Sequence, residues 1–103
     1  MRGAGKRRRE MTAEEAEAVA AQGLAFLAEE PARFARFLAL TGLSVNGLRA
    51  NAGSPEVLRA VLEHLAGDES LLLVFAAGAR VAPETVGEAI AVLQRAGNGS
   101  GAG

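Results

Sequence analysis

The stretch from Asp68 to Ala79, which reads DESLLLVFAAGA, carries no charged side chain after Glu69. If these residues form a helix, apolar groups cover all of its sides, and other elements have to enclose such a helix. Asp68 is a suitable N-cap residue for it. We therefore predict that residues 68–80 form the central helix of a small helical domain. A buried charge introduced by Leu72→Asp should then unfold the protein.

Each of the three prolines stands where a helix would begin. Proline is favoured at the first helical position because its missing N–H would be unpaired there in any case. Pro55 is preceded by Ser54, a good N-cap, and both Pro55 and Pro83 are followed by a glutamate. No run alternates polar and apolar residues as a half-buried strand does. The sequence predicts an all-α fold, a compact bundle of five or six short helices.

Between these start signals, apolar residues recur at helical spacing. The first helix begins at Thr12, which forms a capping box with Glu15. Its predicted inward stripe is Ala16, Val19, Ala20, Gly23, Phe26 and Leu27. The stripes of the fourth and last helices are Val57, Leu58, Val61, Leu62 and Leu65, and Val86, Ala89, Ile90 and Leu93. A second helix ends at Gly42 and a short third helix begins at Ser44.

The two ends of the chain lack an apolar pattern. Residues 1–11 are rich in Gly, Arg and Lys, so we expect a disordered basic arm. Gly97 should end the last helix and leave residues 97–103 as a flexible tail. At 103 residues, the length indicates one domain, which we place at residues 12–96.

Charge and composition exclude several classes of protein. The first ten residues carry five Lys or Arg and one Glu, whereas the remainder carries six Arg and eleven acids, so a basic arm precedes an acidic body. The absence of cysteine excludes disulfides, thiol nucleophiles and cysteine-based zinc sites. No apolar run approaches the roughly 18 residues of a membrane span. We expect a soluble, cytoplasmic protein without a membrane anchor.

Candidate catalytic groups are few. His64 is the only histidine, and near the end of its helix a partly exposed imidazolium would favour the negative end of the helix dipole. Acid pairs such as Glu14-Glu15 are adjacent in sequence, so they do not share a helix face. No stretch has the spacing of a phosphate loop or of a nucleophile with its base. We expect no cofactor, no metal and no enzymatic activity.

The segment from Phe34 to Leu48 has more apolar surface than one inward stripe needs. We predict an interaction surface made of Phe34, Phe37, Leu40, Leu43 and Leu48. Core packing on both sides of the second helix is the alternative. The leading hypothesis is a non-enzymatic protein-interaction or regulatory module that contacts a protein partner or a second copy of itself.

A nucleic-acid-associated protein is the second hypothesis. Its contacts would be Lys6, Arg7, Arg8, Arg9 and Arg49. Residues 34–53 have the outline of a helix-turn-helix, but Leu38 stands where a small residue is needed and Asn51 where an apolar anchor is needed. The acidic body would also repel nucleic acid.

Several segments together resemble a family of small bacterial proteins. They are Phe26-Leu27-Ala28-Glu29 before Pro31, Arg36-Phe37-Leu38 with Leu40-Thr41-Gly42-Leu43, Asp68-Glu69-Ser70-Leu71-Leu72-Leu73 with Phe75, and Pro83-Glu84 with Val86. The family is typical of alphaproteobacteria and is catalogued only as a domain of unknown function. The likeness covers roughly residues 14–95, and departs from the family pattern at Ser44-Val45. It implies a compact helical fold in a bacterial cytoplasm and supplies no catalytic or binding residues.

Overall fold

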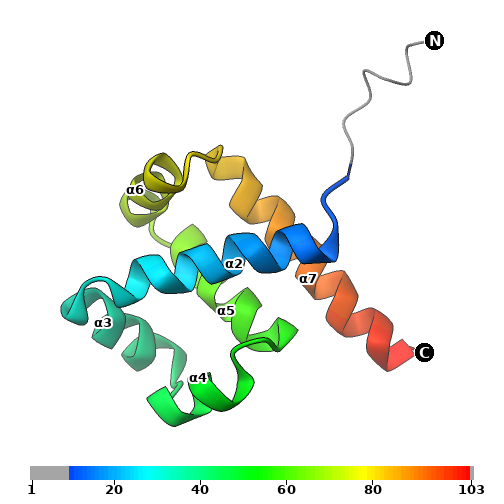
Figure 1. The fold of residues 1–103 in the computed structure, drawn as a ribbon, viewed down its shortest axis with the longest axis horizontal. Coiled ribbons are helices and arrows are strands. Elements are labelled where there is room, and N and C mark those ends of the chain that lie inside the picture. The colour runs from blue at the N-terminus through cyan, green and yellow to red at the C-terminus, as the bar shows by residue number, and fades with distance from the viewer. Residues whose placement is uncertain (1–9, 103) are drawn as a thin grey trace.

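Helices make up nearly all of the part of the chain that the structure describes. This computed structural model describes residues 10–102, which form six helices and no strand (Figure 1). The helices are α2 (Ala13–Ala28), α3 (Pro31–Thr41), α4 (Val45–Asn51), α5 (Pro55–Ala66), α6 (Glu69–Ala79) and α7 (Pro83–Ala102). The predicted all-α fold is confirmed.

The predicted capping signals are found at the ends of the helices. The Thr12 hydroxyl accepts a hydrogen bond from the Glu15 N–H at 3.1 Å, and the Glu15 carboxylate accepts one from the Thr12 N–H at 2.8 Å. Side-chain oxygens also cap α4, α5 and α6, from Ser44, Ser54 and Asp68. Gly42 ends α3 with a φ of 77°, a conformation that glycine adopts without a steric penalty.

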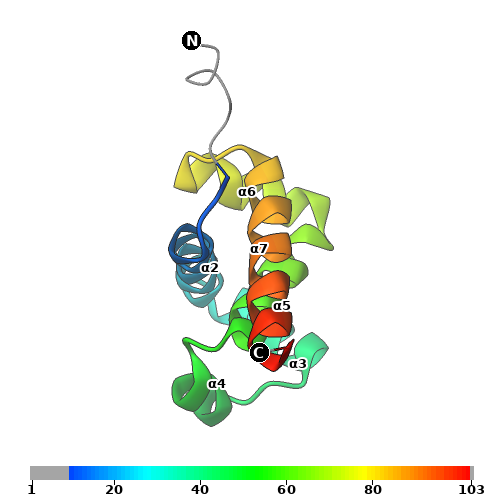
Figure 2. The same ribbon diagram turned by 90° about the vertical axis from the view of Figure 1, so that its right-hand side faces the viewer.

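The central helix is α5. All five of its predicted inward residues are buried, and α2, α3, α6 and α7 all contact it. Helices α2 and α7 also pack against each other, so α2, α5 and α7 form the main core (Figure 2). Arg59 and Ala60, on the other side of α5, are half-buried as well. The helix is therefore covered around most of its circumference.

The prediction that residues 68–80 form the central helix is wrong. Only Phe75 and Ala76 of α6 are buried, and Leu72 is half-buried. The chain turns at Gly67 and places α6 at one end of the bundle, opposite α4 (Figures 1 and 2). After Pro83 the chain returns as α7 along α2 and α5, so α7 covers those helices and leaves one side of α6 exposed.

Helices α2 and α5 approach each other closely at Gly23. A Cβ atom at this position would lie 3.0 Å from Cδ1 of Leu65 and 3.1 Å from Cγ1 of Val61. The absence of a side chain at Gly23 is what allows this approach. The other residues of the predicted α2 stripe are buried, except that Phe26 is half-buried.

The two ends of the chain differ from the prediction in extent. Residues 1–9 of the predicted arm lie outside the described residues, whereas Met11 packs against the core. Helix α7 continues to Ala102, so the predicted end at Gly97 falls inside the helix. Glycine costs about 1 kcal/mol in a helix but, unlike proline, does not remove a backbone hydrogen bond. The flexibility of residues 97–103 stays a prediction.

Candidate functional site

The outer face of α6 is apolar and exposed to solvent. Its members lie on one side of the helix, at positions i, i+3, i+4, i+7 and i+8: Ser70, Leu73, Val74, Ala77 and Gly78. Leu73 is 48% exposed and Val74 is 56% exposed. Contiguous exposed apolar surface marks candidate interaction sites, whereas singly scattered exposed apolar residues are common. We call these five residues the α6 outer face.

Charged residues stand at both ends of this face. Glu69 is the first residue of α6, and Arg80 follows its last residue as the C-cap. Both are exposed, and neither forms an ion pair with another residue in the range 10–102. Arg80 adopts the left-handed conformation with φ 61°, as no other non-glycine residue in the described range does. That conformation costs a side-chain-bearing residue roughly 1 kcal/mol.

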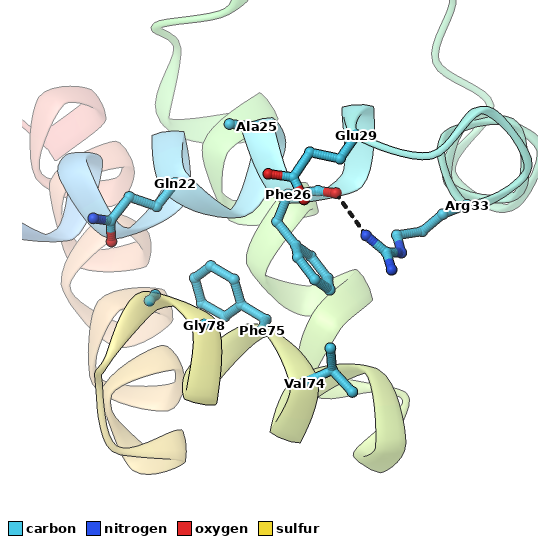
Figure 3. A pocket seen from close by; sticks show the side chains of 9 residues that line it. Gln22, Ala25, Phe26, Glu29, Arg33, Val74, Phe75 and Gly78 are labelled. Atoms are coloured by element: carbon cyan, nitrogen blue, oxygen red, sulfur yellow. Dashed lines mark hydrogen bonds between the residues drawn. The ribbon is translucent and has the colours of Figure 1, made fainter.

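An apolar groove borders the α6 outer face on the side of Val74 and Gly78. It has a volume of about 500 Å³ and lies between α6 and the C-terminal half of α2. At its base the rings of Phe26 and Phe75 lie 5.5 Å apart, centroid to centroid, at an angle of 58° (Figure 3). A Cβ atom at Gly78 would meet no atom within 4 Å, so the groove is open above this residue.

The Arg33 guanidinium closes one end of the groove and is already paired. Its Nη1 donates a hydrogen bond to the Phe26 carbonyl at 2.9 Å (Figure 3). Its Nη2 lies 3.6 Å from the Glu30 carboxylate. The guanidinium also lies over the Phe26 ring, 4.0 Å from the centroid. Arg33 thus fixes the Phe26 ring and joins α3 to α2, and its hydrogen-bonding capacity is partly used within the fold.

Most of the residues predicted to form an interaction surface within residues 34–48 are buried or half-buried in the core. Phe37 is fully buried and Leu48 is 5% exposed, so both are core residues. Phe34 and Leu43 are half-buried against the same core, and Leu40 is 65% exposed. The apolar side chains of α3 therefore serve core packing, which was the alternative, and Leu40 is the one predicted surface residue that lies in the open.

The structure does not bring the predicted nucleic-acid contacts together. Lys6, Arg7, Arg8 and Arg9 lie outside the described residues. Arg49 is exposed near the end of α4, a helix of seven residues that is held to the core mainly by Leu48. The amide of Asn51 donates a hydrogen bond to the Gly47 carbonyl within α4 and does not anchor the helix to the core.

His64 packs between helices instead of facing solvent at a helix end. Its ring meets the Phe37 ring edge-on at 5.2 Å, and its Nε2 is buried without a hydrogen-bond partner. Burial lowers the pKa of His64, and the nearby Arg36 guanidinium lowers it further, whereas Asp68 raises it. A neutral, packed imidazole thus replaces the dipole-stabilised imidazolium of the prediction.

Two further features of the described part of the chain bear on function. In residues 10–102, no cluster of three or more His, Asp or Glu side chains is arranged to hold a metal ion. In the same range no single helix is long and apolar enough to cross a membrane, although α6 and residues 83–97 would suffice together if they were not bent by 97°.

A protein-family model matches residues 13–96, from the first residue of α2 to the last part of α7. The chain belongs to the DUF3572 family. The family is described as a protein of unknown function, which confirms the predicted resemblance to a family catalogued only as a domain of unknown function. The alphaproteobacterial origin stays a prediction. No curated protein and no solved structure matches the chain. The matched segment contains the whole α6 outer face and the groove, and it leaves out residues 6–9 of the basic arm.

Proposed function

We propose that this chain is a non-enzymatic protein-interaction module that binds its partner through the α6 outer face and the adjoining groove. The observation that carries the proposal is the pair of exposed side chains, Leu73 and Val74, beside an open apolar groove. Full burial of a leucine or valine side chain contributes about 1.5–3 kcal/mol. Since each is about half exposed, covering both supplies a partner with roughly 2 kcal/mol before the groove is counted.

The groove favours an apolar partner over an acidic one. Its aromatic base, Phe26 and Phe75, offers shape and apolar area. The one cation at its edge, Arg33, is already engaged by the Phe26 carbonyl and the Glu30 carboxylate. An acidic ligand would have to compete with these contacts, whereas an apolar helix would leave them in place.

Other candidate surfaces have weaker support. Leu40 and Val45 are exposed as well, and Leu40 borders a depression of about 460 Å³. Apart from Leu40 and Gly67, that depression is lined by charged or polar residues: Arg36, Glu63, His64, Asp68 and Glu69. It therefore offers an apolar partner less than the groove beside α6, which has two aromatic rings at its base. The nucleic-acid hypothesis is supported by the exposed Arg49 and by the basic sequence of residues 6–9, which lie outside the described residues. No further cationic side chain is brought next to Arg49 by the contacts of the described residues.

Photo-crosslinking in living cells tests the proposal. A photoreactive benzophenone amino acid is introduced at position 74 in one variant of the full chain and at position 40 in another. We expect protein adducts from position 74 and none from position 40, because both sites are exposed but only the first adjoins the groove. A Leu73→Asp substitution in the same chain should remove the adducts from position 74, since it places a charge on the face that the partner covers.

The control position also decides between the two surfaces. Adducts from position 40 alone would favour the surface predicted from the sequence over the α6 outer face. The absence of protein adducts at both positions, with the chain folded and expressed, would overturn the interaction proposal itself.

A further inference from the structure

We infer that the α6 outer face pairs with the same face of a second copy of this chain, with the two α6 helices antiparallel about a two-fold axis. This inference rests on the proposed function and names the partner. It follows from three properties of the face: the central position of its large side chains, the charges at its ends and the side on which the groove lies.

The large side chains of the face lie at its centre and the small ones at its ends. Leu73 and Val74 are flanked by Ser70 on one side and by Ala77 and Gly78 on the other. In the register that sets Glu69 of one copy beside Arg80 of the other, Leu73 and Val74 of both copies meet around the two-fold axis and cover one another. The small residues on either side let the two helix backbones approach closely there.

The end charges favour an antiparallel over a parallel arrangement, because a parallel pair would set Glu69 beside Glu69 and Arg80 beside Arg80. Glu69 and Arg80 are eleven residues apart, about three helical turns, so their Cα atoms lie within about 20° of each other around the helix axis. The long Arg80 side chain starts from a left-handed backbone and reaches this flank from the end of the helix. A two-fold axis between antiparallel helices brings the same flank of both helices together. Glu69 of each copy then lies beside Arg80 of the other, and one dimer gains two ion pairs. Neither residue has a partner of its own within residues 10–102.

The groove lies on the opposite flank from this pair of charges, next to Val74 and Gly78. The same symmetry therefore brings the two grooves together along the other flank of the helix pair. Each partner helix covers the open space above Gly78, and the Phe26 and Phe75 rings are shielded from water. Glycine would end the helix at this position at a lower conformational cost, but only a residue with a cationic side chain can pair with Glu69 of the other copy. The pairing therefore explains why an arginine adopts the left-handed conformation here.

The area of this contact predicts a weak dimer. Stable interfaces bury about 800 Å² per partner, and an eleven-residue helix, which is about 16 Å long, supplies less than that even with its groove. We therefore expect reversible association with a dissociation constant in roughly the micromolar range.

Sedimentation equilibrium of the full chain over a range of concentrations tests the pairing by charge exchange. Glu69→Arg and Arg80→Glu should each weaken the dimer about tenfold, because each sets like charges together at both ends. The double variant Glu69→Arg/Arg80→Glu should recover affinity to within about threefold of the parent, since the pairs are restored with reversed sign. Glu84→Arg is the matched control: Glu84 is also an exposed acid in a first helical turn, on α7, and its reversal should leave the dimer unchanged.

The outcomes separate this inference from the proposed function. A chain that is monomeric up to high micromolar concentration, or a double variant no better than the single ones, overturns the α6 pairing. If position 74 still forms adducts with a different protein in cells, the interaction module stands and its partner is not a second copy. If the adduct has twice the mass of the chain, both proposals hold. If the single variants lost affinity because they were misfolded, the double variant, which carries both substitutions, would lose it as well. Recovery of affinity in the double variant therefore reports the ion pairs and not folding.

Discussion

At the scale of single residues, His64 links stability to pH. Its pKa in the folded protein lies below the ordinary value near 6.5, because burial disfavours the charged ring. The unfolded chain therefore takes up a proton at a higher pH than the folded chain does. The contribution of the neutral imidazole to the free energy of unfolding is complete above about pH 6.5 and is lost as the pH falls through the lowered pKa.

His64→Leu should remove this component of the pH dependence. We expect urea unfolding of the parent to show stability falling as the pH drops below about 6.5, and the variant to show a shallower fall there. The charged groups that act on the ring, Arg36 and Asp68, are unchanged in the variant. Equal slopes for both chains would mean that His64 does not titrate differently in the folded state.

The left-handed backbone conformation of Arg80 lowers the stability of the folded chain. Because glycine enters the left-handed region freely, Arg80→Gly should raise the free energy of unfolding by about 1 kcal/mol. Thermal or urea unfolding at concentrations well below the dissociation constant of the dimer measures this on the monomer, where association does not contribute. A loss of stability would show that the Arg80 side chain makes a stabilising contact within one chain.

At the scale of helices, α5 and α6 exchange the roles that the sequence predicts for them. Leu62 on α5 is fully buried, whereas Leu73 on α6 is 48% exposed. Leu62→Asp should leave the chain unfolded, because it buries an unpaired charge in the core. Leu73→Asp should keep the melting temperature at low concentration within about 4 °C of that of the parent. Circular dichroism melts of both variants check this, and a Leu73→Asp chain that fails to fold would restore α6 as the central helix.

The helices themselves were predictable from the sequence because their ends are encoded locally. The three prolines, the capping box at Thr12 and the glycine at position 42 each act within one helical turn, so they need no knowledge of the fold. The stripes of α2 and α5 were equally clear, since one apolar side per helix leaves little choice of orientation.

The position of α6 was not predictable in this way. A helix that is apolar on all sides can lie at the centre of a bundle, or at its edge with one apolar side exposed. In this fold α7 packs along α2 and α5, so α6 lies at the edge. The candidate site was missed for the same reason: Leu73 and Val74 looked like core residues. The absence of charged residues between Ser70 and Ala79 predicted that other elements of the chain cover α6 on all sides. In our proposal a binding partner covers the side that the chain itself leaves exposed.

At the scale of the whole molecule, the core and the candidate interface occupy different parts of the bundle. Helices α2, α5 and α7 bury most of the apolar side chains, while α6 turns one apolar side outward at the end away from α4 (Figures 1 and 2). Substitutions on the α6 outer face should therefore change association without unfolding the chain. Substitutions of the buried residues of α5 should abolish folding and, with it, association.

A dilution series followed by two-dimensional ¹H–¹⁵N NMR of the full chain tests the central claim most directly. We predict concentration-dependent shifts of the backbone amides of Leu73, Val74, Ala77 and Gly78, together with Phe26 across the groove, and no change at Leu40 or Val45. Spectra of α6 that do not change with concentration, or changes that centre on Leu40 and Val45, would contradict the assignment of the α6 outer face as the surface on which this protein associates.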